Sequence, residues 1–219
     1  MRAGSSLLKV VMTGVVAFTL SACSASSANE HVVTAAFAPV SLKQELAQSK
    51  RGAGEVILLR GGFDVFSNGL NTMGARLRSR GVNARVLGYK QWRSVVADVA
   101  RNWKRSRRPV VIVGHSWGGN TAIRLATALE RRGVPIAYLA TFAATAPPPV
   151  PGNVRRAVNY YQSSGWGAPL RPARNFRGRL RNVNLAREKG VGHYNIEKQP
   201  KLQRQVIRNV LQVVRRGRS

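Results

Sequence analysis

A serine lies between glycines near the middle of the chain, in a Gly-x-Ser-x-Gly pattern formed by Gly114, Ser116 and Gly118. Residues 110–113 before it are all β-branched and apolar, and apolar residues recur after it at helical spacing. A strand that turns sharply into a helix exposes a serine hydroxyl beside backbone N–H donors, and small flanking residues leave room for the turn. The pattern therefore predicts a nucleophilic serine at a strand-to-helix turn.

Three histidines are present that could serve as the base for this serine. His31 precedes the compact part of the chain, and His115 is the sequence neighbour of Ser116, whose side chain should point away from the nucleophile. His193 lies in a glycine-rich loop late in the chain. We therefore expect His193 to be the base and His115 to pack beneath the turn.

The elements that must position these residues alternate between strand and helix patterns. Strands are expected at residues 56–60, 83–87, 110–113, 136–142, 154–161 and 180–185, and helices at 70–80, 92–105, 122–129 and 202–213. The alternation predicts an α/β fold with a mostly parallel sheet, helices on both faces and functional loops at the carboxyl ends of the strands. The short, proline-rich connection after residue 142 leaves no room for a separate cap, so we expect a single domain.

Three segments together resemble the α/β-hydrolase superfamily, in its small thioesterase- and lipase-like form. They are residues 59–63 (LRGGF), 114–119 (GHSWGG) and 190–194 (GVGHY), and the resemblance covers residues 55–215. It implies Ser116 as nucleophile and His193 as general base and then general acid. It also implies an oxyanion hole formed by the backbone N–H of Trp117 and that of Gly62 or Phe63.

The resemblance fails at the acid that should orient the histidine. In this superfamily that carboxylate follows a strand between the serine and the histidine, but no Asp or Glu occurs between Glu130 and Glu188. Alternatives left open are a bare Ser–His dyad or an orienting group elsewhere, from the candidates Glu188, Glu197, Asp64, Asn159 and Asn195. Without an acid the protein is either a slow hydrolase or one that has lost catalysis.

Several of these residues also have a structural interpretation. Asp64 is expected to cap the helix that follows or to hold its loop. Four aromatic residues line an apolar acyl pocket or belong to the core: Phe63, Phe66, Trp117 and Trp166.

The N-terminus has the pattern of an export signal over residues 1–22, with a basic start and a short apolar run. Residues 20–23 (LSAC) resemble the bacterial lipoprotein box, which implies lipidation of Cys23. Cys23 is the only cysteine, so an intrachain disulfide is excluded. We expect a flexible tether over residues 23–51, a domain over 52–219, and a lipoprotein anchored to a membrane of the bacterial cell envelope.

The chain is strongly basic, with 36 Lys and Arg against 8 Asp and Glu and a formal net charge of +28. The basic residues are spread along the sequence, which favours a general attraction to anionic lipid or polysaccharide of the envelope. We expect no nucleic acid partner, metal or cofactor, because the corresponding motifs are not found.

Two functions therefore remain. The first is an esterase, thioesterase or lipase acting on a small-molecule or lipid ester. The second is a non-catalytic basic envelope lipoprotein on a hydrolase fold.

Overall fold

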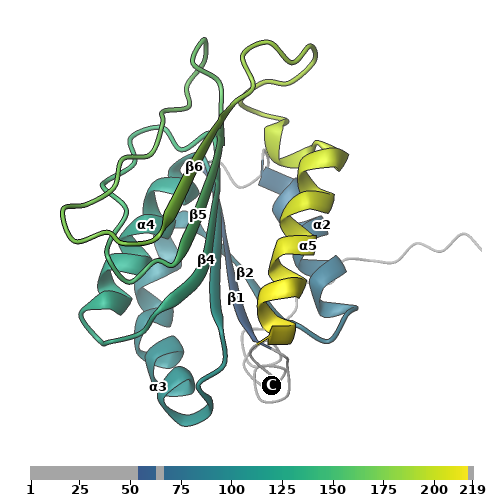
Figure 1. The fold of residues 1–219 in the computed structure, drawn as a ribbon. Helices are drawn as coiled ribbons and strands as arrows, with labels where there is room; N and C mark the ends of the chain where they lie inside the picture. Colours follow the sequence, from purple (N-terminus) through teal and green to yellow (C-terminus); the bar gives the residue numbers. More distant parts are fainter. Residues whose placement is uncertain (1–53, 63–66, 217–219) are drawn as a thin grey trace, which may run out of the picture. The chain divides into compact units, whose positions relative to one another are not determined.

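The fold of the protein is seen in a computed structural model that describes residues 54–62 and 67–216. The chain divides into two compact units, residues 1–38 and 39–219, and every described residue belongs to the second. The described residues of this unit form a six-stranded parallel sheet of order β2-β1-β3-β4-β5-β6 (Figure 1). The predicted α/β fold is confirmed.

The elements follow one another in the expected alternation. The strands are β1 (Glu55–Arg60), β2 (Asn83–Gly88), β3 (Val110–His115), β4 (Ile136–Phe142), β5 (Arg156–Tyr161) and β6 (Arg179–Asn184). The helices are α2 (Asn68–Arg78), α3 (Val96–Ser106), α4 (Trp117–Glu130) and α5 (Pro200–Arg216), with 3₁₀ helices η2 (Tyr89–Val95) and η3 (Ile196–Lys198). The helix expected at 92–105 differs from the structure in its first part, which belongs to the 3₁₀ helix η2. At the start of η2, the Gly88 N–H donates to the Gln91 side chain at 2.8 Å.

Helices cover both faces of the sheet, with α2 and α5 on one side and α3 and α4 on the other (Figure 1). Side chains alternate along each strand, so Leu58 belongs to the core cluster on the α2 and α5 side, whereas its neighbour Leu59 belongs to the cluster on the α3 and α4 side. A strand that is buried on both faces needs a continuous apolar run, which explains why the central strands do not alternate in polarity.

Loops replace helices in the connections from β4 to β5 and from β5 to β6, all of whose residues are described. Val150, Val154 and Leu170 of these loops pack into the core on the α4 side. Asn159 of β5 ties the second loop down, because its amide donates to Ala168 O and to Asn182 Oδ1, each at 3.0 Å. These connections form no separate cap, as predicted.

The strand order reverses between β1 and β3. The chain leaves β1 for β2 on one side and later returns to β3 on the other side. Loops that follow neighbouring strands diverge at such a switch point, and the crevice between them is the usual binding site of an open parallel sheet. Ser116 follows β3 and Gly61 follows β1, so both lie at this crevice. No helix among the described residues is long and apolar enough to cross a membrane.

Candidate active site

Ser116 lies at a tight turn between β3 and α4, with φ 56° and ψ −123°. Its N–H donates to Phe142 O of β4 at 2.8 Å, which fixes the turn to the sheet. A β carbon on Gly114 would lie 2.3 Å from Gly118 O, and one on Gly118 would lie 2.0 Å from Leu59 O, so both positions require glycine. A non-glycine residue held at such angles costs about 1–3 kcal/mol, and such strain is typical of functional sites.

His193 is in hydrogen-bond contact with this serine, with its Nε2 3.0 Å from Ser116 Oγ. Partial burial lowers the pKa of His193 below its ordinary value. The ring is therefore neutral at neutral pH, the state in which a nitrogen can accept the serine proton.

The other ring nitrogen of His193, Nδ1, is buried and has no hydrogen-bond partner among the described residues. To act as a base through Nε2, a neutral His193 must carry its proton on Nδ1. A buried N–H without an acceptor costs about 1–3 kcal/mol. The tautomer needed for catalysis is thus not stabilised by the described part of the chain.

None of the four described orienting candidates makes that contact. Asn159 Oδ1 accepts from Thr141 Oγ1 at 2.8 Å, and Asn195 Oδ1 accepts from Gly192 N–H at 2.7 Å. Glu188 lines a groove that shares no residue with the pocket around Ser116. Glu197 lies beside His115, with its Oε2 3.8 Å from His115 Nε2. The fifth candidate, Asp64, lies outside the described residues.

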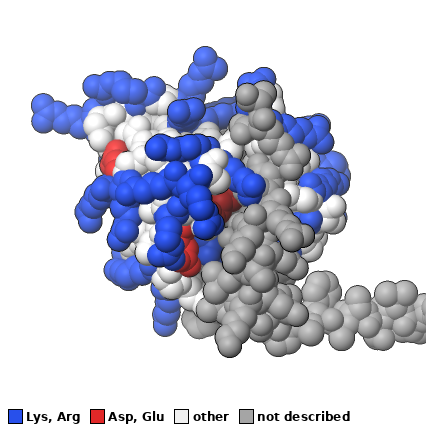
Figure 2. Space-filling view, turned by 90° about the horizontal axis from the view of Figure 1, so that it is seen from below, with Lys and Arg blue, Asp and Glu red and all other residues white. Residues whose placement is uncertain are grey.

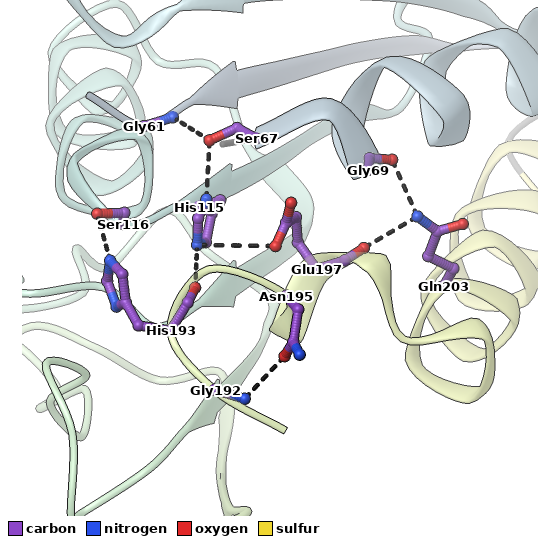
Figure 3. Close-up of polar contacts among 10 residues, drawn as sticks. All are labelled: Gly61, Ser67, Gly69, His115, Ser116, Gly192, His193, Asn195, Glu197 and Gln203. Atoms are coloured by element: carbon purple, nitrogen blue, oxygen red, sulfur yellow. Dashed lines mark hydrogen bonds and ion pairs between the residues drawn. The ribbon is translucent and has the colours of Figure 1, made fainter. Parts of the chain in front are cut away.

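His115 is buried beneath the turn, as expected, and links the loop after β1 to the histidine loop (Figure 3). Its Nε2 is 2.8 Å from His193 O, and its Nδ1 is 2.8 Å from Ser67 Oγ, which accepts Gly61 N–H at 2.9 Å. Burial lowers the pKa of His115 to about 4, so the ring is neutral. A carbonyl can only accept, so Nε2 carries the proton and Ser67 Oγ–H donates to Nδ1.

Glu197 is fully buried, and neither of its carboxyl oxygens has a hydrogen-bond partner among the described residues. Desolvation raises its pKa to about 7. Its backbone carbonyl accepts from Gln203 Nε2 at 2.9 Å, and the same amide donates to Gly69 O at 3.0 Å (Figure 3). This double contact fixes η3, which follows the His193 loop, against α2.

The loop after β1 lies directly against the nucleophile. A β carbon on Gly61 would lie 2.9 Å from Ser116 Cβ, and one on Gly62 would lie 2.7 Å from the Trp117 ring. Trp117 is the first residue of α4, so its N–H lies at the positive end of the helix. Gly62 and Trp117 thus border the place where an oxyanion would form, whereas Phe63 lies outside the described residues, as do Phe66 and Cys23.

A pocket of about 150 Å³ opens at Ser116 and His193. Its walls include the three most exposed large apolar side chains of the described residues, Trp117 (44%), Trp166 (67%) and Tyr194 (50%). The Trp166 ring centroid is 5.5 Å from that of His193, and the Tyr194 centroid is 5.2 Å from it. Exposed aromatic walls around a polar pair suit an apolar acyl group whose carbonyl lies at the serine.

Comparisons with known proteins identify the family of this chain. The sequence profile described as the alpha/beta hydrolase family matches residues 7–206. The chain belongs to the alpha/beta hydrolase family. No significant match is found among curated protein sequences.

Solved structures share the fold of this alpha/beta hydrolase. Human thioesterase 2 superposes with a TM-score of 0.54 and 11% identity, covering 76% of this chain and 98% of that one. A structure described for the metagenome-derived lipolytic enzymes LipS and LipT gives a TM-score of 0.48 and 10% identity. The match covers 76% of this chain and 95% of that one. At such low identity the likeness to human thioesterase 2 shows a shared fold.

Sequence reasoning on this hydrolase missed two residues at the site. Ser67 joins Gly61 to His115, but nothing in its sequence context marks a serine that is needed only in three dimensions. Thr145 lines the pocket and is held by the Asn120 amide at 2.9 Å. Among the described residues there is no cluster of three or more His, Cys, Asp or Glu that could hold a metal ion.

Proposed function

We propose that the protein is a serine hydrolase that cleaves carboxylic esters or thioesters by acyl transfer. The observation that carries the proposal is the 3.0 Å contact between His193 Nε2 and Ser116 Oγ at a strained strand-to-helix turn. The aromatic pocket at this pair supports an apolar acyl group as the part of the substrate that is held.

In the proposed reaction Ser116 Oγ attacks the acyl carbonyl while His193 Nε2 takes the hydroxyl proton. The Trp117 and Gly62 N–H groups stabilise the negative charge on the carbonyl oxygen. His193 then gives its proton to the leaving alcohol or thiol, which leaves an acyl group on Ser116. Water attacks this ester with His193 again as base, and the carboxylic acid departs.

The rate should be modest, because His193 has no orienting group in the described part of the chain. Loss of the acid from such a triad lowers kcat by on the order of 10⁴-fold, while oxyanion stabilisation and binding leave on the order of 10³-fold over water. The position of His193 is supported instead through its backbone, by the hydrogen bond from His115.

Covalent labelling with a fluorophosphonate probe tests the proposal. The wild-type protein should become labelled on Ser116, and both Ser116→Ala and His193→Ala should lose the label. Ser79→Ala, which changes an exposed serine far along the chain from the site, is the matched control and should label like wild type. A correctly folded wild-type protein that takes no label would overturn the proposal.

We also propose that the protein is a lipoprotein of the bacterial cell envelope, anchored through Cys23 and attracted to anionic surfaces. The basic composition supports this: Lys and Arg cover much of the face shown in Figure 2, with little Asp or Glu between them. The same feature favours the second candidate function, a non-catalytic lipoprotein that binds anionic envelope components. The labelling experiment separates the two functions.

A further inference from the structure

A second concave site lies apart from the catalytic pocket, and its lining includes Glu188 and Val191 from the segment that precedes His193. It is a groove of about 260 Å³ that is lined by residues of β6, of the segment after β6 and of the start of α5. Its lining shares no residue with the pocket at Ser116. Nothing in the proposed acyl-transfer reaction uses it.

A buried hydroxyl at this groove, that of Tyr160, makes no hydrogen bond to the described residues. Tyr160 is 1% exposed and its ring stacks on Phe142 at 5.3 Å, yet its hydroxyl has no hydrogen-bond partner among the described residues. A buried hydroxyl left unpaired is costly, and most are paired in folded proteins. Burial raises the pKa of Tyr160, so the group keeps its proton and can donate a hydrogen bond.

Two basic side chains line the same groove as that donor. Arg181 of β6 lines the groove and lies close enough to Tyr160 to oppose the rise of its pKa, and Lys201 lines it from the first turn of α5. Neither side chain makes a hydrogen bond or ion pair with another described residue. Glu188 is the single acidic residue of the lining, so the groove has a net positive charge. Two cations beside a neutral O–H donor favour an anionic headgroup.

The remaining walls are apolar. Val183, Leu185 and Leu202 face the same groove, and Leu185 and Leu202 belong to the core beneath it. A ligand that matches both parts has an anionic head and a hydrocarbon tail.

We infer that the groove between β6 and α5 binds a fatty acid, whose carboxylate accepts a hydrogen bond from the Tyr160 hydroxyl and pairs with Arg181 and Lys201 while its chain lies on Val183, Leu185 and Leu202. A bound carboxylate would give the Tyr160 hydroxyl its missing partner. The site is separate from the catalytic pocket, and it stands whether or not Ser116 is a nucleophile.

Calorimetric titration of the full-length protein with dodecanoate, below the concentration at which it forms micelles, tests the inference. Tyr160→Phe keeps the ring and removes only the hydroxyl, and it should weaken binding about tenfold, as expected for loss of a hydrogen bond to a charged group. Arg181→Gln should weaken binding by a similar factor. Arg124→Gln, which changes an exposed arginine of α4 away from the groove, is the control that should bind like wild type.

The inference would be overturned if dodecanoate did not bind, or if it bound Tyr160→Phe and Arg181→Gln as tightly as wild type. It would also be overturned if binding were lost in Trp166→Ala but kept in Tyr160→Phe, because that result would assign the fatty acid to the catalytic pocket. Tighter binding of dodecyltrimethylammonium or dodecyl phosphate than of dodecanoate would overturn it as well, because that result would assign the headgroup to another class. A thermal stability of ligand-free Tyr160→Phe that is at least that of wild type would show that a loss of binding is not a loss of fold.

Discussion

At the scale of single residues, the central arrangement is a histidine that reaches its serine through Nε2 but is fixed through its backbone. His115 donates to His193 O, and Ser67 and Gly61 complete the chain of hydrogen bonds on the other side of His115. These hydrogen bonds join the His193 loop to the loop that borders the oxyanion position. A substitution that breaks them should therefore lower the rate of catalysis although Ser116 and His193 are unchanged.

The pH dependence of turnover reports the protonation of His193. The neutral ring is the active base, and burial lowers its pKa below the ordinary value of 6.5. We expect kcat/KM for an activated ester to rise with pH, with a midpoint below 6.5, and to be level near neutral pH. The measurement is the kcat/KM profile of the free enzyme from pH 4.5 to 8, and a midpoint above 6.5 would contradict this account of the base.

Ser67→Ala should weaken both stability and turnover. The change leaves His115 Nδ1 and Gly61 N–H without a partner in a buried site, which costs about 1–3 kcal/mol in the free energy of unfolding. We also expect kcat to fall while KM changes little, because the loop bordering the oxyanion position loses its link to His115. Urea unfolding and steady-state kinetics check this.

The control for this change is Ser94→Ala. Its exposed hydroxyl donates to Gln91 O at 2.7 Å within η2, away from the site. If the two variants were equally stable and equally active, the hydrogen-bond chain through Ser67 would have no role.

At the scale of elements, the sequence already predicts the strands, the order of helices and the turn at Ser116. Continuous apolar runs such as residues 110–113 can be read locally, and glycine spacing marks the turn. The contacts of the histidine loop could not be read this way. Glu197 is only four residues from His193, yet η3 directs its carboxyl to His115, and Asn195 hydrogen-bonds within its own loop. The position of the Glu197 carboxyl depends on how η3 packs against α2, which the sequence does not reveal.

The burial of Glu197 by η3 predicts a pH-dependent cost in stability. Its pKa is about 7 in the folded protein against an ordinary 4.5, so the carboxyl is protonated in both states below pH 4.5. Between pH 4.5 and 7 the unfolded chain ionises first, and folding loses up to about 3 kcal/mol. Glu197→Gln cannot ionise, so it should match wild type near pH 4.5 and be more stable at pH 8.

Denaturant unfolding at both pH values measures this difference. His115 titrates with the opposite sign, because its pKa is lowered to about 4, but it is present in both proteins and largely cancels. Glu188→Gln is the matched control at an exposed position and should show no such gain. A Glu197→Gln protein less stable than wild type at pH 8 would mean that the carboxylate forms a stabilising ion pair with His115.

At the scale of the whole molecule, we expect the net charge of +28 to add an ionic attraction to anionic surfaces beyond that of the proposed lipid anchor. The two can be separated, because salt screens charge but does not extract an acyl chain. We expect wild-type protein to remain in the membrane fraction after a high-salt wash. Cys23→Ser should be released by that wash, and it should lack the mass of the lipid.

Fractionation with and without salt, followed by intact mass measurement, checks this prediction. A Cys23→Ser protein that stays with membranes in high salt would contradict the anchor at Cys23. Release of the wild type by salt would contradict it as well.

The most direct test of acyl transfer through Ser116 is pre-steady-state turnover of a p-nitrophenyl ester with analysis of the acylated peptide. We predict a burst of p-nitrophenolate, an acyl group on the peptide that contains Ser116, and loss of both in Ser116→Ala. Turnover that persists in Ser116→Ala, or an acyl group found on another residue, would contradict the account.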